Sequence, residues 1–213
     1  MPVDWKNLLK PSETAVLVIE CQEGVIGESS LLKGLVQAVQ DGGLVPRLAR
    51  FLGFARSAGV PVFHCTVEKR ADGLGDAFNT PLTASLRGRR SPMSPGSKVA
   101  AIIKGLEPDP TDHLVPRASG MTAFHDCGLD SILRSLGVKT VVPTGVSVNI
   151  AITGATIDAV NRGMRVAIPT DCVAGTPPEY AQAVLQNTLR NLAYLTTAEE
   201  MVSAWGLNWN GGR

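Results

Sequence analysis

Residues 141–156 read VVPTGVSVNIAITGAT, and this stretch decides the fold class. Its apolar opening at 140–143 is too short for a helix, and it passes through Thr144-Gly145 into residues 150–162, whose apolar positions follow helical spacing. The pattern predicts a strand, a tight turn and the start of a helix. Such a junction points free backbone N–H groups and the positive end of the helix dipole at whatever lies above the sheet edge. We therefore expect an anion or oxyanion site here.

Apolar runs alternate with helical patterns along the rest of the chain, which predicts βαβ units and a parallel sheet with helices on both faces. The expected strands are residues 14–20, 60–65, 113–117, 139–144, 165–170 and 192–196. The expected helices are 35–57 with an interruption near Gly42-Gly43, a short one at 99–104, 129–136, 150–162, and one that opens with a capping box at 176–179 and runs to about 191. Residues 66–98 are irregular and rich in glycine and proline, and loops of this length usually cover a pocket. The sequence therefore predicts a single α/β domain over residues 1–213, a three-layer sandwich around a six-stranded parallel sheet.

Composition excludes several classes of protein. A net charge of +1 gives no electrostatic footprint for nucleic acid or an anionic membrane. The start MPVDWKNLLKPSE lacks a signal-peptide pattern, and no stretch reaches the ~18 apolar residues that a membrane span needs, so we expect a cytoplasmic protein. A basic cluster in a Gly/Ser/Pro-rich stretch is interpreted as a solvated loop: Arg87, Arg89 and Arg90. The four cysteines lack zinc-type spacing and are expected to be free thiols: Cys21, Cys65, Cys127 and Cys172.

Polar side chains from four distant segments fall at expected strand ends: Glu20, His64, Arg117 and the turn at 147–151. In open α/β sheets, ligands bind outside the carboxyl ends of strands where the strand order reverses, so these segments should meet in one crevice. Glu20 follows five apolar residues and is placed to act as a general acid. His64 is either a core histidine or a site residue, and Gln22 binds either loop backbone or a ligand. Arg117 is a surface cation, a counter-ion for Glu20, or a clamp for an anionic ligand.

Three segments resemble the isochorismatase-like cysteine hydrolases, which include nicotinamidases, N-carbamoylsarcosine amidases and isochorismatases. Residues 144–151 (TGVSVNIA) resemble the nucleophile segment of that family. Residues 15–22 (AVLVIECQ) resemble its first strand, which ends in a catalytic aspartate followed one residue later by glutamine. Residues 114–117 (LVPR), followed by 122–124 (TAF), resemble its lysine segment. The resemblance runs from about Thr14 to Trp205.

The resemblance implies a three-residue catalytic centre, but this chain departs from it at every position. Glu20 stands for aspartate, Arg117 for lysine and Ala151 for the nucleophilic cysteine. In the family, the peptide that enters the nucleophile turn is a non-proline cis bond, and here Val146-Ser147 occupies that place. The implied substrate contacts are Gln22, His64, Met121, Phe124, Ser147, Asn149, Ile150 and Ala151.

The resemblance also implies that no cofactor is used, that the substrate is a small molecule, and that the protein is a homo-oligomer, either a dimer or a tetramer. Nicotinamidases bind a metal ion through an aspartate and histidines after the second strand. This chain has Asp72 and Asp76 there without a neighbouring histidine, so no metal ion is expected.

Two functions fit these residues. The first is an isochorismatase-family hydrolase of a small polar or carboxylate-bearing molecule that works without a cysteine nucleophile and uses Glu20 as general acid/base. This reading is favoured because the carboxylate and the cation remain, although alanine cannot attack a carbonyl. The second is a catalytically silent binding or assembly protein that keeps the crevice. A third explanation, replacement of one catalytic cysteine by alanine, would not account for Glu20 and Arg117.

Overall fold

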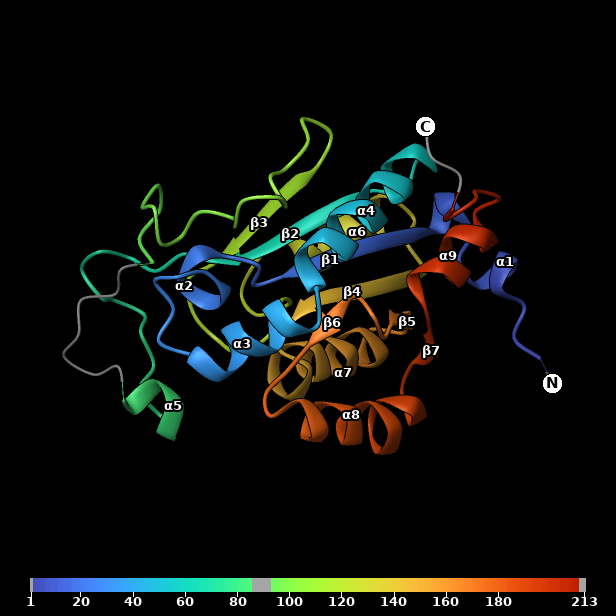
Figure 1. The fold of residues 1–213 in the computed structure, drawn as a ribbon. Helices are drawn as coiled ribbons and strands as arrows, with labels where there is room; N and C mark the ends of the chain where they lie inside the picture. The colour runs from blue at the N-terminus through green and yellow to red at the C-terminus, as the bar shows by residue number, and fades with distance from the viewer. Residues whose placement is uncertain (1, 86–92, 211–213) are drawn as a thin grey trace.

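The computed structural model describes residues 2–85 and 93–210, and within them the chain forms a parallel β-sheet between two layers of helices (Figure 1). The strand order is β3-β2-β1-β4-β5-β7, and a two-residue strand, β6, pairs with β4. The strands are β1 (Thr14–Ile19), β2 (Val62–Val67), β3 (His113–Arg117), β4 (Thr140–Val146), β5 (Arg165–Pro169), β6 (Val173–Ala174) and β7 (Tyr194–Thr196). The six predicted strands and their parallel arrangement are confirmed.

The strand order reverses between β1 and β4. From β1 the chain proceeds outward through β2 to β3, and it then returns to β4 on the other side of β1 before continuing to β5 and β7. Ile19 at the end of β1 pairs with Cys65 of β2 and with Gly145 of β4. The carboxyl ends of β1, β2 and β4 therefore meet at the point where α/β sheets bind ligands.

Helices cover both faces of the sheet. One hydrophobic core contains residues of α6, α7 and α8, and the other contains residues of α3, α4 and α9. The helices are α1 (Trp5–Leu8), α2 (Glu23–Ile26), α3 (Lys33–Asp41), α4 (Leu44–Ser57), α5 (Pro81–Ala84), α6 (Leu129–Ser135), α7 (Thr153–Asn161), α8 (Pro178–Asn187) and α9 (Ala198–Ala204), with 3-10 turns η1 (Pro11–Glu13) and η3 (Leu189–Asn191) and a π-helical turn η2 (Val148–Ile152).

The strands are buried on both faces because each strand divides its side chains between the two cores. In β1, Ala15, Leu17 and Ile19 enter the α6–α8 core, and Val16 and Val18 enter the α3–α4 core. All six residues of β1 are buried, which explains a continuous apolar run rather than an alternating one.

The interruption predicted near Gly42-Gly43 is confirmed. The helix α3 ends at Asp41 and α4 begins at Leu44, with Gly43 at φ 60° between them. Glycine adopts this left-handed conformation at little cost, because it has no Cβ.

Three predictions about helices are wrong. The helix predicted at 150–162 begins at Val148 with the π-helical turn η2, before α7. Residues 99–104 form no helix, because their backbone carbonyls accept from another segment: the amide of Glu23 donates to Ala101, and that of Gly24 to Val99. The predicted capping box at 176–179 is absent, because α8 begins at Pro178 with Pro177 as its N-cap, and proline has no side-chain acceptor.

The basic cluster Arg87, Arg89 and Arg90 lies outside the described residues. In the ranges 2–85 and 93–210, no helix is long and apolar enough to cross a membrane.

Candidate active site

Glu20 sits immediately after β1 and leaves the strand conformation, with φ 53°. Its amide still donates to the carbonyl of Cys65 on β2 (3.0 Å), but the side-chain alternation of the strand is lost. Cys21 accordingly enters the α3–α4 core instead of the core that holds Ile19. The turn leaves the Glu20 carboxylate against the guanidinium of Arg117, with 17% of its side chain exposed.

Arg117 ends β3, and its side chain is only 4% exposed. It lies on the same face of the edge strand as the buried Val115. Its Nη2 donates to Oε1 of Glu20, whereas Nε and Nη1 are buried without a hydrogen-bond partner among the described residues. Burying a cation with two unpaired nitrogens destabilises the fold, since each unsatisfied buried donor costs about 1–3 kcal/mol of desolvation free energy. The interpretation of Arg117 as a counter-ion for Glu20 agrees with this geometry, and that of a surface cation does not.

The third part of the expected site is the turn after β4. Gly145 has φ 91°, and a Cβ at this position would lie 2.8 Å from Sγ of Cys21, so the close approach of β1 and β4 requires glycine. The peptide between Val146 and Ser147 is cis. Ala151 is 2% exposed and belongs to the α6–α8 core together with Val115, Phe124 and Ile19.

The remaining residues of this turn point in different directions. Ser147 is half-buried, and its carbonyl accepts from the amides of Ile150 (3.2 Å) and Ile152 (3.0 Å). Ile150 is 40% exposed. Oδ1 of Asn149 is buried without a hydrogen-bond partner in the described ranges, and it lies beside Gly175 in the connection from β6 to α8. The Asn149 carbonyl is therefore turned toward the start of α8.

Gln22 is fully buried and uses its amide on backbone. Nε2 donates to the carbonyls of Val67 (3.0 Å) and Ala100 (2.7 Å), and Oε1 accepts from the amide of Val67 (2.7 Å). Val67 and Ala100 stand at the two ends of the irregular segment predicted to cover the pocket. The structure supports the backbone-binding interpretation of Gln22: it ties both ends of that segment to the residues after Glu20.

We expect Gln22→Ala to loosen both ends of this segment. The Val67 amide should exchange with deuterium at least about tenfold faster, because its buried acceptor is removed, at a cost of about 1–3 kcal/mol. Hydrogen exchange of peptides that cover residues 64–69 and 97–102 measures this. Gln37→Ala is the matched control, since the side chain of Gln37 donates to the exposed Asp41 on its own helix. Unchanged exchange at Val67 would show that Gln22 does not hold the segment.

His64 does not lie with Glu20 and Arg117, and its prediction as a substrate contact is corrected. Its neighbours Phe63 and Cys65 enter the α6–α8 core that Arg117 faces, so His64 points to the opposite face of β2. There it is 1% exposed, and Nε2 lies 3.0 Å from Oδ2 of Asp112. Burial lowers the pKa of His64, and the hydrogen bond to Asp112, which raises it, is the weaker effect. His64 is thus a neutral core histidine.

Asp112, which the sequence pattern did not single out, is the centre of a buried cluster. Its carboxylate is 1% exposed and accepts from Nε and Nη2 of Arg56 (3.1 and 2.6 Å), from the amide of Asp109 (3.0 Å) and from His64. Asp112 directly precedes β3, so the cluster lies at the amino end of that strand. A carboxylate before an edge strand resembles any loop residue, and only the paired strands bring Arg56 and His64 to it.

Phe124 and Met121 lie in the connection from β3 to α6. Phe124 is 4% exposed, and the guanidinium of Arg162 lies over its ring at 4.8 Å. Met121 is half-buried. The half-buried Cys127 packs against the same core, and its Sγ donates to the carbonyl of Ala123 (3.1 Å).

The buried thiols are poor nucleophiles. Burial raises the pKa of Cys21 to about 12, and it raises the pKa values of Cys65 and Cys172 still further. At Cys65 the charges of Cys127 and Glu20 raise the pKa further and Arg117 lowers it. The Cys65 carbonyl accepts from the amide of Glu20, so this residue lies beside Glu20. A thiolate is the reactive form, so these three cysteines are inert at neutral pH.

The carboxylates after β2 are engaged in ion pairs. Asp76 accepts from Nζ of Lys69 (2.7 Å), and Asp72 pairs with Arg70. Within residues 2–85 and 93–210, no three His, Cys, Asp or Glu side chains are grouped to hold a metal ion. The absence of a metal ion stays a prediction.

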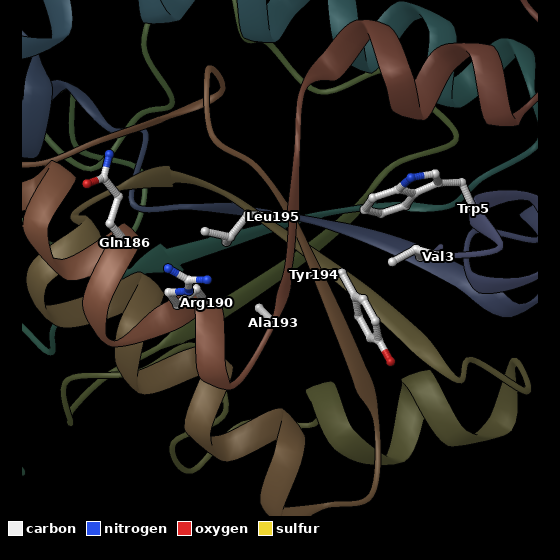
Figure 2. A pocket seen from close by; sticks show the side chains of 7 residues that line it. All are labelled: Val3, Trp5, Gln186, Arg190, Ala193, Tyr194 and Leu195. Carbon is white, nitrogen blue, oxygen red and sulfur yellow. The ribbon is translucent and has the colours of Figure 1, made fainter. Parts of the chain in front are cut away.

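Two surface pockets lie away from the Glu20–Arg117 pair. One, of about 430 Å³, opens beside β7, at the end of the sheet opposite to β3. Figure 2 shows Leu195 between Val3 and Trp5 on one side and Gln186 and Arg190 on the other. The other pocket, of about 360 Å³, is lined in part by Val148, Arg47, Asp171 and Gln182. Neither pocket contains Glu20 or Arg117 in its lining.

Known proteins are similar to this chain in sequence over most of its length. The model of the Isochorismatase domain matches residues 14–200. The chain belongs to the isochorismatase-like cysteine hydrolase family. Ureidoacrylate amidohydrolase RutB of Rhizobium rhizogenes is 27% identical over 208 residues, which cover 90% of this chain and 83% of the relative.

Solved structures of isochorismatase-like proteins share the fold. A cysteine hydrolase from Pseudomonas syringae pv. phaseolicola matches with a TM-score of 0.79 at 22% identity, over 92% of this chain and 93% of the other. N-carbamoylsarcosine amidase from Thermoplasma acidophilum matches with a TM-score of 0.69 at 21% identity, over 88% and 97% of the two chains. The predicted family and the predicted fold are both confirmed.

Proposed function

We propose that this isochorismatase-like protein hydrolyses a small polar or carboxylate-bearing molecule without a cysteine nucleophile. The observation that carries the proposal is the Glu20–Arg117 pair at the strand-order reversal, in which a buried guanidinium keeps two nitrogens idle. A carboxylate next to a cation with free donors can transfer a proton to a ligand that the cation holds.

Ala151 supports a mechanism without a covalent intermediate. We infer that it occupies the position of the nucleophilic cysteine in the family, because it ends the segment TGVSVNIA, which resembles the nucleophile segment, and follows the Gly145 turn. A methyl group has no lone pair for attack on a carbonyl. The three thiols with raised pKa values do not replace it, and Cys127 binds the carbonyl of Ala123.

The chemistry left to the crevice is proton transfer by Glu20. A protonated Glu20 would donate to the double bond of a vinyl ether, and water would add to the resulting oxocarbenium ion. Ionised Glu20 would instead take a proton from water that attacks a ureido or amide carbonyl. In either case Arg117 would hold a substrate carboxylate, and the turn at Ser147 and Ala151 would contact polar substrate atoms.

The relatives support an anionic substrate with a hydrolysable nitrogen–carbon bond. The curated relatives are named ureidoacrylate amidohydrolases, and ureidoacrylate carries a carboxylate. We extend only the class of molecule to this chain: a small acid with a ureido, amide or vinyl ether group.

A hydrolysis screen tests the proposal. Purified protein is incubated with small acids that carry ureido, amide, carbamate or vinyl ether groups, and with their neutral methyl esters, and products are quantified by mass spectrometry. We expect turnover of at least one acid and at least about tenfold less of its ester, since a charge-assisted hydrogen bond contributes about 1.5–3 kcal/mol. Turnover of the esters alone would contradict an anion-binding Arg117.

Thiol alkylation should leave this hydrolysis largely intact. The half-buried Cys127 is expected to react first with iodoacetamide, and the activity that remains should exceed about half, because no thiol takes part in the proton transfer. The measurement is the initial rate against the degree of labelling by mass spectrometry. Complete inactivation that substrate prevents would identify a relocated cysteine nucleophile.

A binding protein without turnover is the second candidate, and Ala151 is the residue that favours it. It predicts saturable binding of a small acid with no product above the uncatalysed rate, and the same screen decides between the two. The homo-oligomeric state, a dimer or a tetramer, stays a prediction that light scattering after size exclusion would test.

A further inference from the structure

The contact between Glu20 and Arg117 uses one oxygen and one nitrogen. Oε1 of Glu20 accepts from Nη2 of Arg117, although a guanidinium can present two parallel donors to a carboxylate. Arg56 binds Asp112 in that two-bond way, through Nε and Nη2. Nε and Nη1 of Arg117 therefore have no hydrogen-bond partner among the described residues, although the side chain is only 4% exposed.

The shape of the guanidinium decides where a second acid fits. Its two bidentate edges are Nε with Nη2 and Nη1 with Nη2, so Nη2 belongs to both edges. Glu20 occupies this shared nitrogen. A ligand carboxylate that binds either edge must therefore share Nη2 with Glu20 or displace it. Where the two share Nη2, the oxygens of the ligand and those of Glu20 lie close together.

We propose that binding of a carboxylate ligand to Arg117 is coupled to the uptake of one proton by Glu20. A second carboxylate next to the same cation raises the free energy of ionised Glu20, whose side chain is only 17% exposed, so both acids cannot stay ionised without a penalty. The proton comes from the buffer and goes to Glu20, and no other bond changes. The inference rests on the proposed function, in which a protonated Glu20 is the general acid, and it means that the substrate itself generates that acid.

The neighbours of the pair leave Glu20 as the group that takes up the proton. Besides Arg117, the titratable neighbours of Glu20 in the described part of the chain are thiols: Cys21, next to it in the sequence, and Cys65, whose carbonyl accepts from the Glu20 amide. Cys127 in turn acts on Cys65. Cys21 and Cys65 are already protonated at neutral pH, because burial raises their pKa values. The carboxylate of Glu68 lies 3.4 Å from the hydroxyl of Thr66, and Thr66 points to the sheet face opposite to Cys65.

Calorimetry with 4-oxopentanoate, an acid without a hydrolysable bond, tests the coupling. Titrations at pH 7 in buffers of different ionisation enthalpy give the number of protons taken up. We expect close to one proton for the native protein, and an affinity that rises up to about tenfold for each unit by which the pH is lowered. The neutral analogue 5-hydroxypentan-2-one should bind more weakly and without proton uptake.

Variants identify the group. Glu20→Gln keeps the size of the side chain and should abolish proton uptake while it strengthens binding of 4-oxopentanoate at pH 7 by about tenfold, because the competing anion is gone. Arg117→Met should weaken binding by at least about tenfold, and Arg117→Lys is the second variant if Arg117→Met does not fold. Glu68→Gln is the matched control and should behave as the native protein.

Binding of 4-oxopentanoate without proton uptake, uptake that persists in Glu20→Gln, or no binding of the acid would each overturn the inference. The outcome is independent of turnover. Hydrolysis without proton-linked binding would refute the coupling and leave the proposed function standing. Proton-linked binding without hydrolysis would refute the proposed function and leave the coupling standing.

Discussion

Glu20→Gln is expected to lower kcat/KM for hydrolysis of the best acid substrate by about 10²–10⁴-fold, the usual contribution of a general acid or base. Glutamine keeps the length of the side chain, and its amide oxygen can still accept from Arg117. The amide does not titrate near neutral pH, so it can act neither as a general acid nor as a general base. The measurement is steady-state hydrolysis, with circular dichroism and thermal unfolding to show that the variant is folded.

Glu23→Gln is the matched control for this variant. It makes the same chemical change three residues away, in the first turn of α2, where the residue is half-buried. It should keep the native rate within about twofold, since substitutions outside the site and the core usually change the stability of the fold little. Equal rates for Glu20→Gln and the native protein would remove Glu20 from the reaction.

Asp112→Ala is expected to destabilise the fold by about 3 kcal/mol, because it leaves Arg56 and the Asp109 amide without their buried acceptor. For a chain of this length that corresponds to a fall in Tm of about 6–12 °C. Hydrolysis should be unaffected at temperatures where the variant is folded, since the cluster lies on the sheet face opposite to Arg117. Thermal unfolding by calorimetry measures the change.

Asp72→Ala is the control, since Asp72 binds Arg70 through the same two-nitrogen geometry at an exposed position. Its Tm should stay close to the native value, because exposed ion pairs contribute little. A similar fall in Tm for both variants would show that the buried Asp112 cluster stabilises the fold no more than an exposed Arg–Asp pair does.

The same cluster sets a direction for stability against pH. Burial would raise the pKa of Asp112, but hydrogen bonds from Arg56, the Asp109 amide and His64 outweigh it and hold the pKa below the usual 3.8. The stabilisation from Asp112 is thus present above pH 3.8 and is lost as the pH falls through the folded-state pKa. The difference in unfolding free energy between the native protein and Asp112→Ala should shrink below pH 3.8.

His64 contributes in a higher pH range. Its pKa in the folded protein lies below the usual 6.5, so the unfolded chain takes up a proton at this residue while the folded chain does not. The free energy of unfolding should therefore fall as the pH drops below 6.5. Urea denaturation of the native protein between pH 5 and 8 measures this decline, and a constant midpoint over that range would contradict a buried neutral His64.

The sheet was predictable because its signal is local. The central strand β1 is a short apolar run in which all six residues are buried. The edge strand β3 agrees with its predicted bounds, His113–Arg117, although only Val115 and Arg117 are buried in it. Boundaries that depend on another segment were not predictable. The carbonyls of Val99 and Ala101 accept from the amides of Gly24 and Glu23, which lie far earlier in the chain, and no pattern within 99–104 shows that competition.

The candidate site was predictable to the level of its charges. Glu20 follows β1 and Arg117 ends β3. Parallel strands bring their carboxyl ends to one edge of the sheet, so the two residues were expected to lie together. His64 also lies in such a strand, but its place depends on which face of β2 it occupies. Two consecutive positions differ only by the alternation of side chains, and the apolar run VFHCTV gives no sign of the face.

Crystals soaked with the ureido acid that the protein turns over most slowly would test the claim that Glu20 and Arg117 together form the substrate site. We predict a ligand carboxylate oxygen at about 2.7–2.9 Å from Nε or Nη1 of Arg117, with the hydrolysable group within one water of Glu20. A ligand bound elsewhere, with Arg117 still held by Glu20 alone, would contradict it.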